Sequence, residues 1–185
     1  QRSPKRSDVL SVFVGIRPLV KSSDTKNTAK LSRDHTIEID NSNLVTLTGG
    51  KWTTYRNMAE DAVDRALGLM NFPSKQCVTK HLEIENRCPQ QIAEIINENL
   101  SLGEKLHEDF AYTKADVVNA VRNEMARRVE DVLARRTRIL FLDAKVALEI
   151  SRDVAEIMAK ELERDEDWIN SQLKIFESLA QNYLV

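Results

Sequence analysis

The residues best suited to chemistry form the stretch GGKWTTYR at positions 49–56. This stretch follows a short apolar segment, Leu44–Leu47, and opens a segment with helical periodicity. Two glycines at a strand-to-helix turn let a ligand approach bare backbone. The start of a helix adds unpaired N–H groups and a partial positive charge. The stretch therefore suits an anion or the electron-rich edge of a cofactor.

Three cations are predicted to lie at the ends of elements in the same part of the chain. Arg17 follows an apolar run, Arg33 precedes a strand pattern, and Lys51 stands at the helix start. If strand ends and helix starts of one sheet converge on a crevice, two guanidinium forks and an ammonium would hold a phosphate or carboxylate. The competing interpretation is that each is a solvated surface cation, the glycines form an ordinary turn, and the threonines cap the helix.

The elements that must position these residues can be read from hydrophobic periodicity. The apolar, β-branched run Val9–Ile16 predicts a buried strand. Alternation over His35–Asp40 predicts a second strand, which forms a hairpin with Leu44–Leu47. Apolar residues at helical spacing predict a helix from about Thr53 to Leu69, with small alanines against a sheet. Residues 73–87 are polar and irregular, which indicates a linker.

The pattern after Pro89 is almost purely helical. Helices are predicted over Gln90–Asn99, from an N-cap at Thr113, and over Val129–Arg135, Asp143–Leu162 and Asp165–Tyr183. The predicted fold is thus an α+β portion followed by an all-α domain, mostly helical overall, with a small sheet at the N-terminus. The predicted boundary divides the chain into residues 1–73 and 74–185.

Composition and charge exclude several classes of function. The chain has 185 residues and a net charge of −2, so no overall field attracts nucleic acid. Residues 124–138 are rich in arginine, but carboxylates interleave with them and stacking aromatics are missing, which predicts intramolecular ion pairs instead. Cys77 and Cys88 lack ligand spacing and are interpreted as free thiols in a reducing compartment, with a disulfide between them as the less favoured alternative.

Other familiar catalytic patterns are missing from the sequence. His35, His81 and His107 have no partner at ligand spacing, which argues against a metal site. His35 follows Arg33 by two residues and could face the same crevice, although a structural role is the favoured interpretation. The P-loop, GxSxG and GxGxxG patterns are also absent.

Several motifs together resemble the FAD-dependent glycerol-3-phosphate dehydrogenases. In the first part these are GIRPL at 15–19, SRDH at 32–35 and TGGKWTTYRNMAEDAV at 48–63. In the second, residues 124–138 resemble the signature of that family's helical C-terminal domain, and Asp143-Ala144 and the pattern Trp168, Gln172, Phe176 fit it as well. The resemblance covers nearly the whole chain.

The resemblance implies oxidation of sn-glycerol 3-phosphate to dihydroxyacetone phosphate, with hydride passing to FAD and electrons to the quinone pool. Arg17 and Arg33 resemble the family's substrate-binding arginines, and Lys51 resembles the lysine beside substrate and flavin, which makes it the candidate catalytic residue. The cofactor-binding positions implied for the flavin edge are Gly49, Gly50, Lys51, Trp52, Thr53 and Thr54.

The chain departs from the family because the GxGxxG unit that grips the ADP half of FAD is not in it. We therefore expect a C-terminal fragment that neither retains FAD nor turns over alone. The open alternatives are an oxidase that passes electrons to oxygen and a non-catalytic helical interaction module. The expected location is cytoplasmic, with peripheral attachment to the inner face of the membrane and oligomerisation as options; nucleic acid is not expected as a partner.

Overall fold

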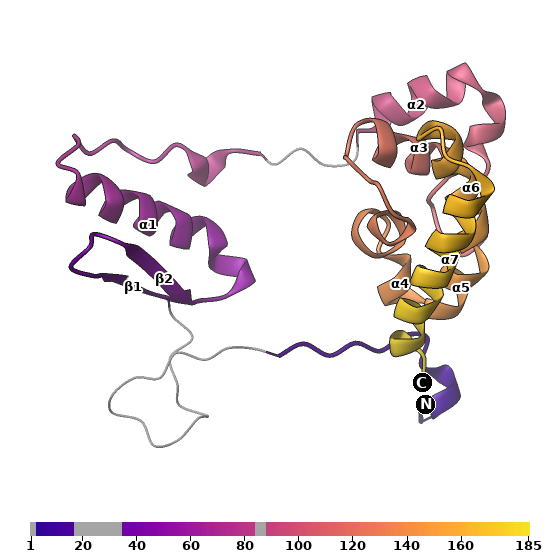
Figure 1. Ribbon diagram of the computed structural model, residues 1–185, viewed down its shortest axis with the longest axis horizontal. Coiled ribbons are helices and arrows are strands. Elements are labelled where there is room, and N and C mark those ends of the chain that lie inside the picture. The colour runs from indigo at the N-terminus through magenta and orange to yellow at the C-terminus, as the bar shows by residue number, and fades with distance from the viewer. Residues whose placement is uncertain (1–2, 17–34, 84–87) are drawn as a thin grey trace. The chain divides into compact units, whose positions relative to one another are not determined.

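The computed structural model describes residues 3–16, 35–83 and 88–185, and these divide into two compact units. One unit combines Gln1–Val14 with Asn86–Val185, and the other is Gly15–Glu85. The predicted class, mostly helical with a small sheet near the N-terminus, is confirmed. The first unit is helical, and the second holds the sheet and one helix (Figure 1).

The second unit is a hairpin covered by a helix. Strands β1 (His35–Ile39) and β2 (Val45–Gly49) pair antiparallel, with His35 opposite Gly49. The connecting turn is stabilised by the Asp40 carboxylate, which accepts hydrogen bonds from the Ser42 amide at 2.7 Å and the Leu44 amide at 3.0 Å. The predicted hairpin is therefore confirmed.

Helix α1 (Tyr55–Leu69) follows a short 3-10 turn over Trp52–Thr54, close to the predicted start. Its predicted buried face is only partly realised, because no residue of α1 is fully buried and Val63 remains 56% exposed. The two-stranded hairpin is too small to cover a full helical stripe. Arg56 instead anchors the following segment, since its guanidinium donates to Glu60 at 2.6 Å and to Thr79 Oγ1 at 3.3 Å.

The first unit is a bundle of short helices around a closed apolar core. In chain order the α-helices are α2 (Pro89–Glu98), α3 (Lys114–Arg122), α4 (Ile139–Leu142), α5 (Ala144–Glu149), α6 (Ser151–Glu161) and α7 (Glu166–Ala180). Helix α6 packs against both α3 and α7. The largest fully buried side chains include Leu133, Ile139, Met158 and Phe176. Phe176 and its half-buried neighbour Trp168 pack inside the bundle.

Side-chain caps define several helix starts as the sequence predicts. Thr113 precedes α3, and the Asp116 carboxylate accepts from its amide at 2.7 Å and from its hydroxyl at 2.9 Å. Asp165 accepts from the Trp168 amide at the start of α7. Such caps satisfy amides that the helix itself leaves unpaired.

Two helix predictions in this unit need correction. The segment predicted as an α-helix over Val129–Arg135 is a π-helix over Asp131–Arg136. The long helix predicted over Asp143–Leu162 is two helices, α5 and α6, that meet at Ile150. At that junction the Ser151 hydroxyl donates to the Leu148 carbonyl at 2.7 Å, a local bond that competes with continuous helix.

The prediction of a buried strand over Val9–Ile16 is wrong. Among the described residues the run pairs with no strand, and Val14 and Ile16 are 96% and 99% exposed. Its first part crosses the helical unit: the Ala144 amide donates to the Leu10 carbonyl at 3.1 Å, and the Val12 amide donates to the Tyr183 carbonyl at 2.9 Å. β-branched residues favour extended backbone, but a strand also needs a partner.

The units also differ from the expected division at residues 73 and 74, because Gln1–Val14 contacts the helical unit and residues up to Glu85 belong with the hairpin. These compact units are defined by contacts within the structure, so the predicted domain boundary between residues 73 and 74 stays a prediction. Among residues 3–16, 35–83 and 88–185, no helix combines the length and apolar character needed to cross a bilayer.

Candidate functional site

The candidate site is the turn that joins β2 to α1. Gly49 and Gly50 both adopt left-handed backbone, with φ of 78° and 77°, and Lys51 returns to extended backbone before the 3-10 turn. Two consecutive positive φ angles suit glycine because a Cβ atom would be strained there. The paired glycines are thus a conformational requirement of this turn.

Protein atoms fill one side of the turn. A Cβ atom at Gly50 would stand only 2.7 Å from Met58 Cε and 3.4 Å from His35 Cβ. The close approach that glycine permits at this position is therefore made by Met58, from α1. A ligand would have to meet the turn at another side, where the backbone passes into Lys51 and the 3-10 turn.

Lys51 is the exposed cation of this turn. Its side chain has no ion pair with the part of the chain that the structure describes. Its amide donates to Thr54 Oγ1 at 3.3 Å, and the Thr54 hydroxyl donates back to the Lys51 carbonyl at 3.0 Å. The hydroxyl of Thr54 therefore has the capping role that the competing interpretation assigned to it. The Lys51 ammonium remains available to an anion.

The other predicted cofactor positions lie in the 3-10 turn. Trp52 is 86% exposed, and its ring stacks on that of Tyr55 with the centroids 5.6 Å apart. Thr53 is also exposed. The amides of Trp52 and Thr53 begin the helical segment, where backbone geometry offers them no partner within the helix. An exposed cation, a helix start and an aromatic face thus lie on consecutive residues.

Arg17 and Arg33, the predicted substrate-binding residues, lie outside the described residues. Their convergence on Lys51 stays a prediction. His35, in contrast, is described, and it lies beside the turn as the cross-strand partner of Gly49.

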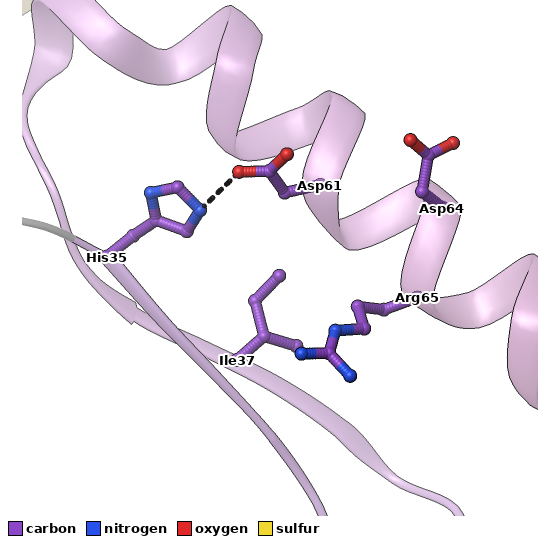
Figure 2. A pocket seen from close by; sticks show the side chains of 5 residues that line it. All are labelled: His35, Ile37, Asp61, Asp64 and Arg65. Atoms are coloured by element: carbon purple, nitrogen blue, oxygen red, sulfur yellow. Dashed lines mark ion pairs between the residues drawn. The ribbon is translucent and has the colours of Figure 1, made fainter. Parts of the chain in front are cut away.

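A cavity of about 440 Å³ lies between β1 and α1, next to this turn. Figure 2 shows His35 and Ile37 from the strand facing Asp61 and Arg65 from the helix, while Asp64 points away from the strand. His35 Nε2 lies 2.8 Å from Asp61 Oδ2. The His35 side chain is 20% exposed and that of Asp61 is 53% exposed.

Sequence reasoning considered His35 but missed Asp61 as its partner. The two are far apart in the sequence, and only the packing of α1 against β1 brings them together. The periodicity of α1 could have given a hint, because Met58 and Asp61 are three residues apart and so share a face of the helix.

The arginine-rich segment in the helical unit is tied down internally, as predicted. The Asp131 carboxylate accepts from the amides of Arg127 and Arg128 at 2.9 and 3.0 Å. The Arg135 guanidinium donates to Glu130 and Asp131, and that of Arg136 pairs with Glu124. These bonds stabilise the irregular backbone around the π-helix, whereas Arg128 and Arg138 are exposed and have no ion pair among the described residues.

Both cysteines are free thiols, as predicted. The described residues also contain no group of three or more His, Cys, Asp or Glu side chains that could hold a metal ion. The turn and its neighbouring cavity are therefore the candidate site that the described residues support.

Comparison with known proteins identifies the family. A family model described as the C-terminal domain of alpha-glycerophosphate oxidase matches residues 43–168. Because this match covers more than half of the chain, the chain belongs to that family.

The relatives carry related names. The chain is 35% identical over 196 residues to a probable mitochondrial glycerol-3-phosphate dehydrogenase of Caenorhabditis elegans, which covers 86% of this chain and 27% of the relative. It is 32% identical over 225 residues to the mitochondrial glycerol-3-phosphate dehydrogenase SDP6 of Arabidopsis thaliana, covering 97% and 36%. The chain thus spans about a third of the length of the curated relatives it matches.

Proposed function

We propose that this chain is part of a flavoenzyme that oxidises sn-glycerol 3-phosphate to dihydroxyacetone phosphate. The observation that carries the proposal is the strand–Gly49-Gly50–Lys51–helix turn, found in a chain of this family. The names of the relatives support the same reaction, because they are glycerol-3-phosphate dehydrogenases.

The residues of the turn fit the flavin part of FAD. One edge of the flavin ring is electron-rich. The turn would present to that edge the exposed ammonium of Lys51 and the amides of a helix start. The filled space between Gly50 and Met58 excludes approach from α1. FAD would supply the acceptor for the hydride that leaves the C2 carbon of the substrate.

Residues of this chain would bind the substrate and orient it toward that acceptor. Lys51 would stabilise the negative charge that hydride transfer places on the flavin, because a fixed cation costs no reorganisation at that moment. Arg17 and Arg33 would hold the phosphate of the substrate through bidentate hydrogen bonds. Holding the phosphate would direct the C2–H bond at the acceptor and so lower the entropic part of the barrier.

Flavin content and turnover test the proposal. The 185-residue chain lacks a GxGxxG unit for the ADP half of FAD, so we expect it to purify without stoichiometric flavin. The product of the complete gene should show flavin absorbance and reduce a dye with glycerol 3-phosphate. A yellow 185-residue chain would refute the expectation that it does not retain FAD, and a flavin-loaded complete product that ignores glycerol 3-phosphate would refute the substrate.

The electron acceptor separates the two forms of the activity. We propose quinone, because the relatives are named dehydrogenases, although the family model is named after an oxidase. Oxygen consumption and peroxide release distinguish them: a dehydrogenase reduces a soluble quinone analogue much faster than it reduces oxygen.

Cytoplasmic location with peripheral attachment to a membrane stays a prediction, as does oligomerisation. The names of several relatives contain the word mitochondrial, which favours a mitochondrial location instead. Fractionation of cells that express the complete gene decides between the two locations.

A further inference from the structure

The unit that carries the candidate site has almost no hydrophobic core. Within residues 35–83, no side chain is fully buried, whereas the helical unit contains a closed core. A two-stranded hairpin is marginally stable by itself. The shape of the Gly49–Lys51 turn must therefore depend on a few specific contacts between the hairpin and α1.

Two of these contacts meet at the turn, and both come from one face of α1. Met58 packs against Gly50, and Asp61, one helical turn later, pairs with His35 at 2.8 Å. His35 is the cross-strand neighbour of Gly49, and its Cβ lies against the same point of Gly50 as Met58. The pair thus ties the strand opposite the glycines to the helix that follows them.

We infer that His35 and Asp61 form a positioning pair that holds the Gly49–Lys51 turn against α1 and so sets the place of Lys51. His35 supplies the donor, Nε2–H, and Asp61 supplies the acceptor. The pair acts through the turn and is not itself a catalytic group. Its role for Lys51 in turnover rests on the proposed function, whereas its effect on the turn does not.

The surroundings of the pair favour this specific contact. Among the described residues, the charged side chains that line the cavity with His35 are Asp61, Asp64 and Arg65, all from α1. Asp64 points away from the strand (Figure 2), and neither Asp64 nor Arg65 has an ion pair within the described residues. Asp61 alone meets the imidazole, so Asp64 offers a matched control on the same helix.

The first test uses the 185-residue chain and needs no activity. Amide hydrogen exchange at Lys51 reports on the turn, because that amide donates to Thr54 Oγ1. We expect His35→Ala and Asp61→Ala to speed exchange at Lys51 by about fivefold, the size of one net hydrogen bond. His35→Gln and Asp61→Asn, which keep a donor or an acceptor, should return the rate to within about twofold of the parent. Asp64→Ala should leave it unchanged.

The second test uses the complete gene product with glycerol 3-phosphate and a dye. His35→Ala should lower kcat by about tenfold and change KM by less than about twofold, because Lys51 acts on charge that develops in the transition state. His35→Gln should recover most of kcat. A simple loss of folded protein would lower flavin content as well, so kcat is expressed per bound flavin.

The outcomes separate the two proposals. Parent exchange rates at Lys51 in both alanine variants overturn the positioning pair, whatever the enzyme does. Faster exchange in both alanine variants, recovery in the conservative ones and no effect of Asp64→Ala support it. If the parent gene product does not oxidise glycerol 3-phosphate, the proposed function fails, and the exchange measurement still decides the inference.

Discussion

The side chain of Met58 occupies the space beside Gly50 in which a Cβ atom would stand, with Met58 Cε only 2.7 Å from that point. Gly50 also has φ of +77°, a conformation that residues with a side chain rarely adopt. Conformation and packing therefore require glycine at this position independently of any ligand. The sequence of the paired glycines suggests a ligand site, but the second glycine, Gly50, is required by its contact with the Met58 side chain.

Gly50→Ala should destabilise the turn by about 1–3 kcal/mol, because it combines backbone strain with a clash. Urea unfolding followed by Trp52 fluorescence in a Trp168→Phe background measures the loss. Gly68→Ala is the matched control, since Gly68 lies in α1 with nothing within 4 Å of its added Cβ, and it should be neutral or stabilising. The double variant Gly50→Ala/Met58→Ala should remove the clash with the Met58 side chain but keep the backbone strain of the positive φ angle. Equal stability of Gly50→Ala and the parent contradicts this account.

Local signals explain which elements could be predicted. The hairpin and the capped start of α3 are each specified by a few adjacent residues, and they are found as predicted. The pairs of Arg135 with Glu130 and Asp131 were predictable because these residues lie within one or two helical turns, whereas the pair of Arg136 with Glu124 joins residues farther apart.

Two of the failures have a common physical cause, which is dependence on distant residues, whereas the third has a local cause. Val9–Ile16 has every local feature of a strand, but pairing requires a second strand, and helix ends bind part of it instead. The His35–Asp61 pair could not be predicted, because it exists only when α1 packs on β1. The break at Ile150 depends on one hydroxyl that the apolar stripe does not reveal.

The hairpin turn should be sensitive to acid through Asp40. Hydrogen bonds from the Ser42 hydroxyl, and then from the Leu44 and Ser42 amides, hold the pKa of the Asp40 carboxyl below its ordinary value of 3.8. A lowered pKa in the folded state means that the contribution to stability is fully present above pH 3.8 and is lost as the pH falls through the folded value. NMR titration of the Asp40 carboxyl and of the Leu44 amide should follow one curve with a midpoint below 3.8. Asp40→Asn should abolish the transition at Leu44; a midpoint above 3.8 contradicts the prediction.

Arg122 should stabilise the helical unit in a way that depends on salt and not on pH. Its guanidinium, on α3, donates to Glu161 of α6 at 2.7 Å and to Glu98 of α2 at 2.8 Å. These hydrogen bonds, that with Glu161 first, raise the pKa of Arg122 above its ordinary value, so its contribution is lost only at very high pH. Between about pH 6 and pH 9 the effect of the substitution should therefore be flat.

Because the Arg122 side chain is 40% exposed, Arg122→Ala should cost only about 0.5–1 kcal/mol in urea unfolding at low salt, and less at high salt. Arg152→Ala is the comparison, since its pairs with Glu156 and Glu166 are longer, at 3.4 Å, and more exposed. It should cost less than Arg122→Ala. The reverse order would show that the links between α2, α3 and α6 do not matter for stability.

The complete gene product should depend on Arg17 and Arg33 for substrate affinity. If each guanidinium grips the phosphate, Arg17→Ala and Arg33→Ala should each weaken binding by about 1.5–3 kcal/mol, which is roughly a 10- to 150-fold rise in KM. Lysine at either position keeps the positive charge but cannot make the two parallel hydrogen bonds of a guanidinium, so it should recover only part of the affinity for glycerol 3-phosphate. Arg164→Ala, an exposed arginine of the helical unit with no ion pair in the described part of the chain, is the control and should leave KM unchanged. Because glycerol lacks the phosphate that the arginines would bind, its oxidation should be equally weak in the parent and in all of these variants. Parent KM values for glycerol 3-phosphate in both alanine variants would remove the two arginines from the substrate site.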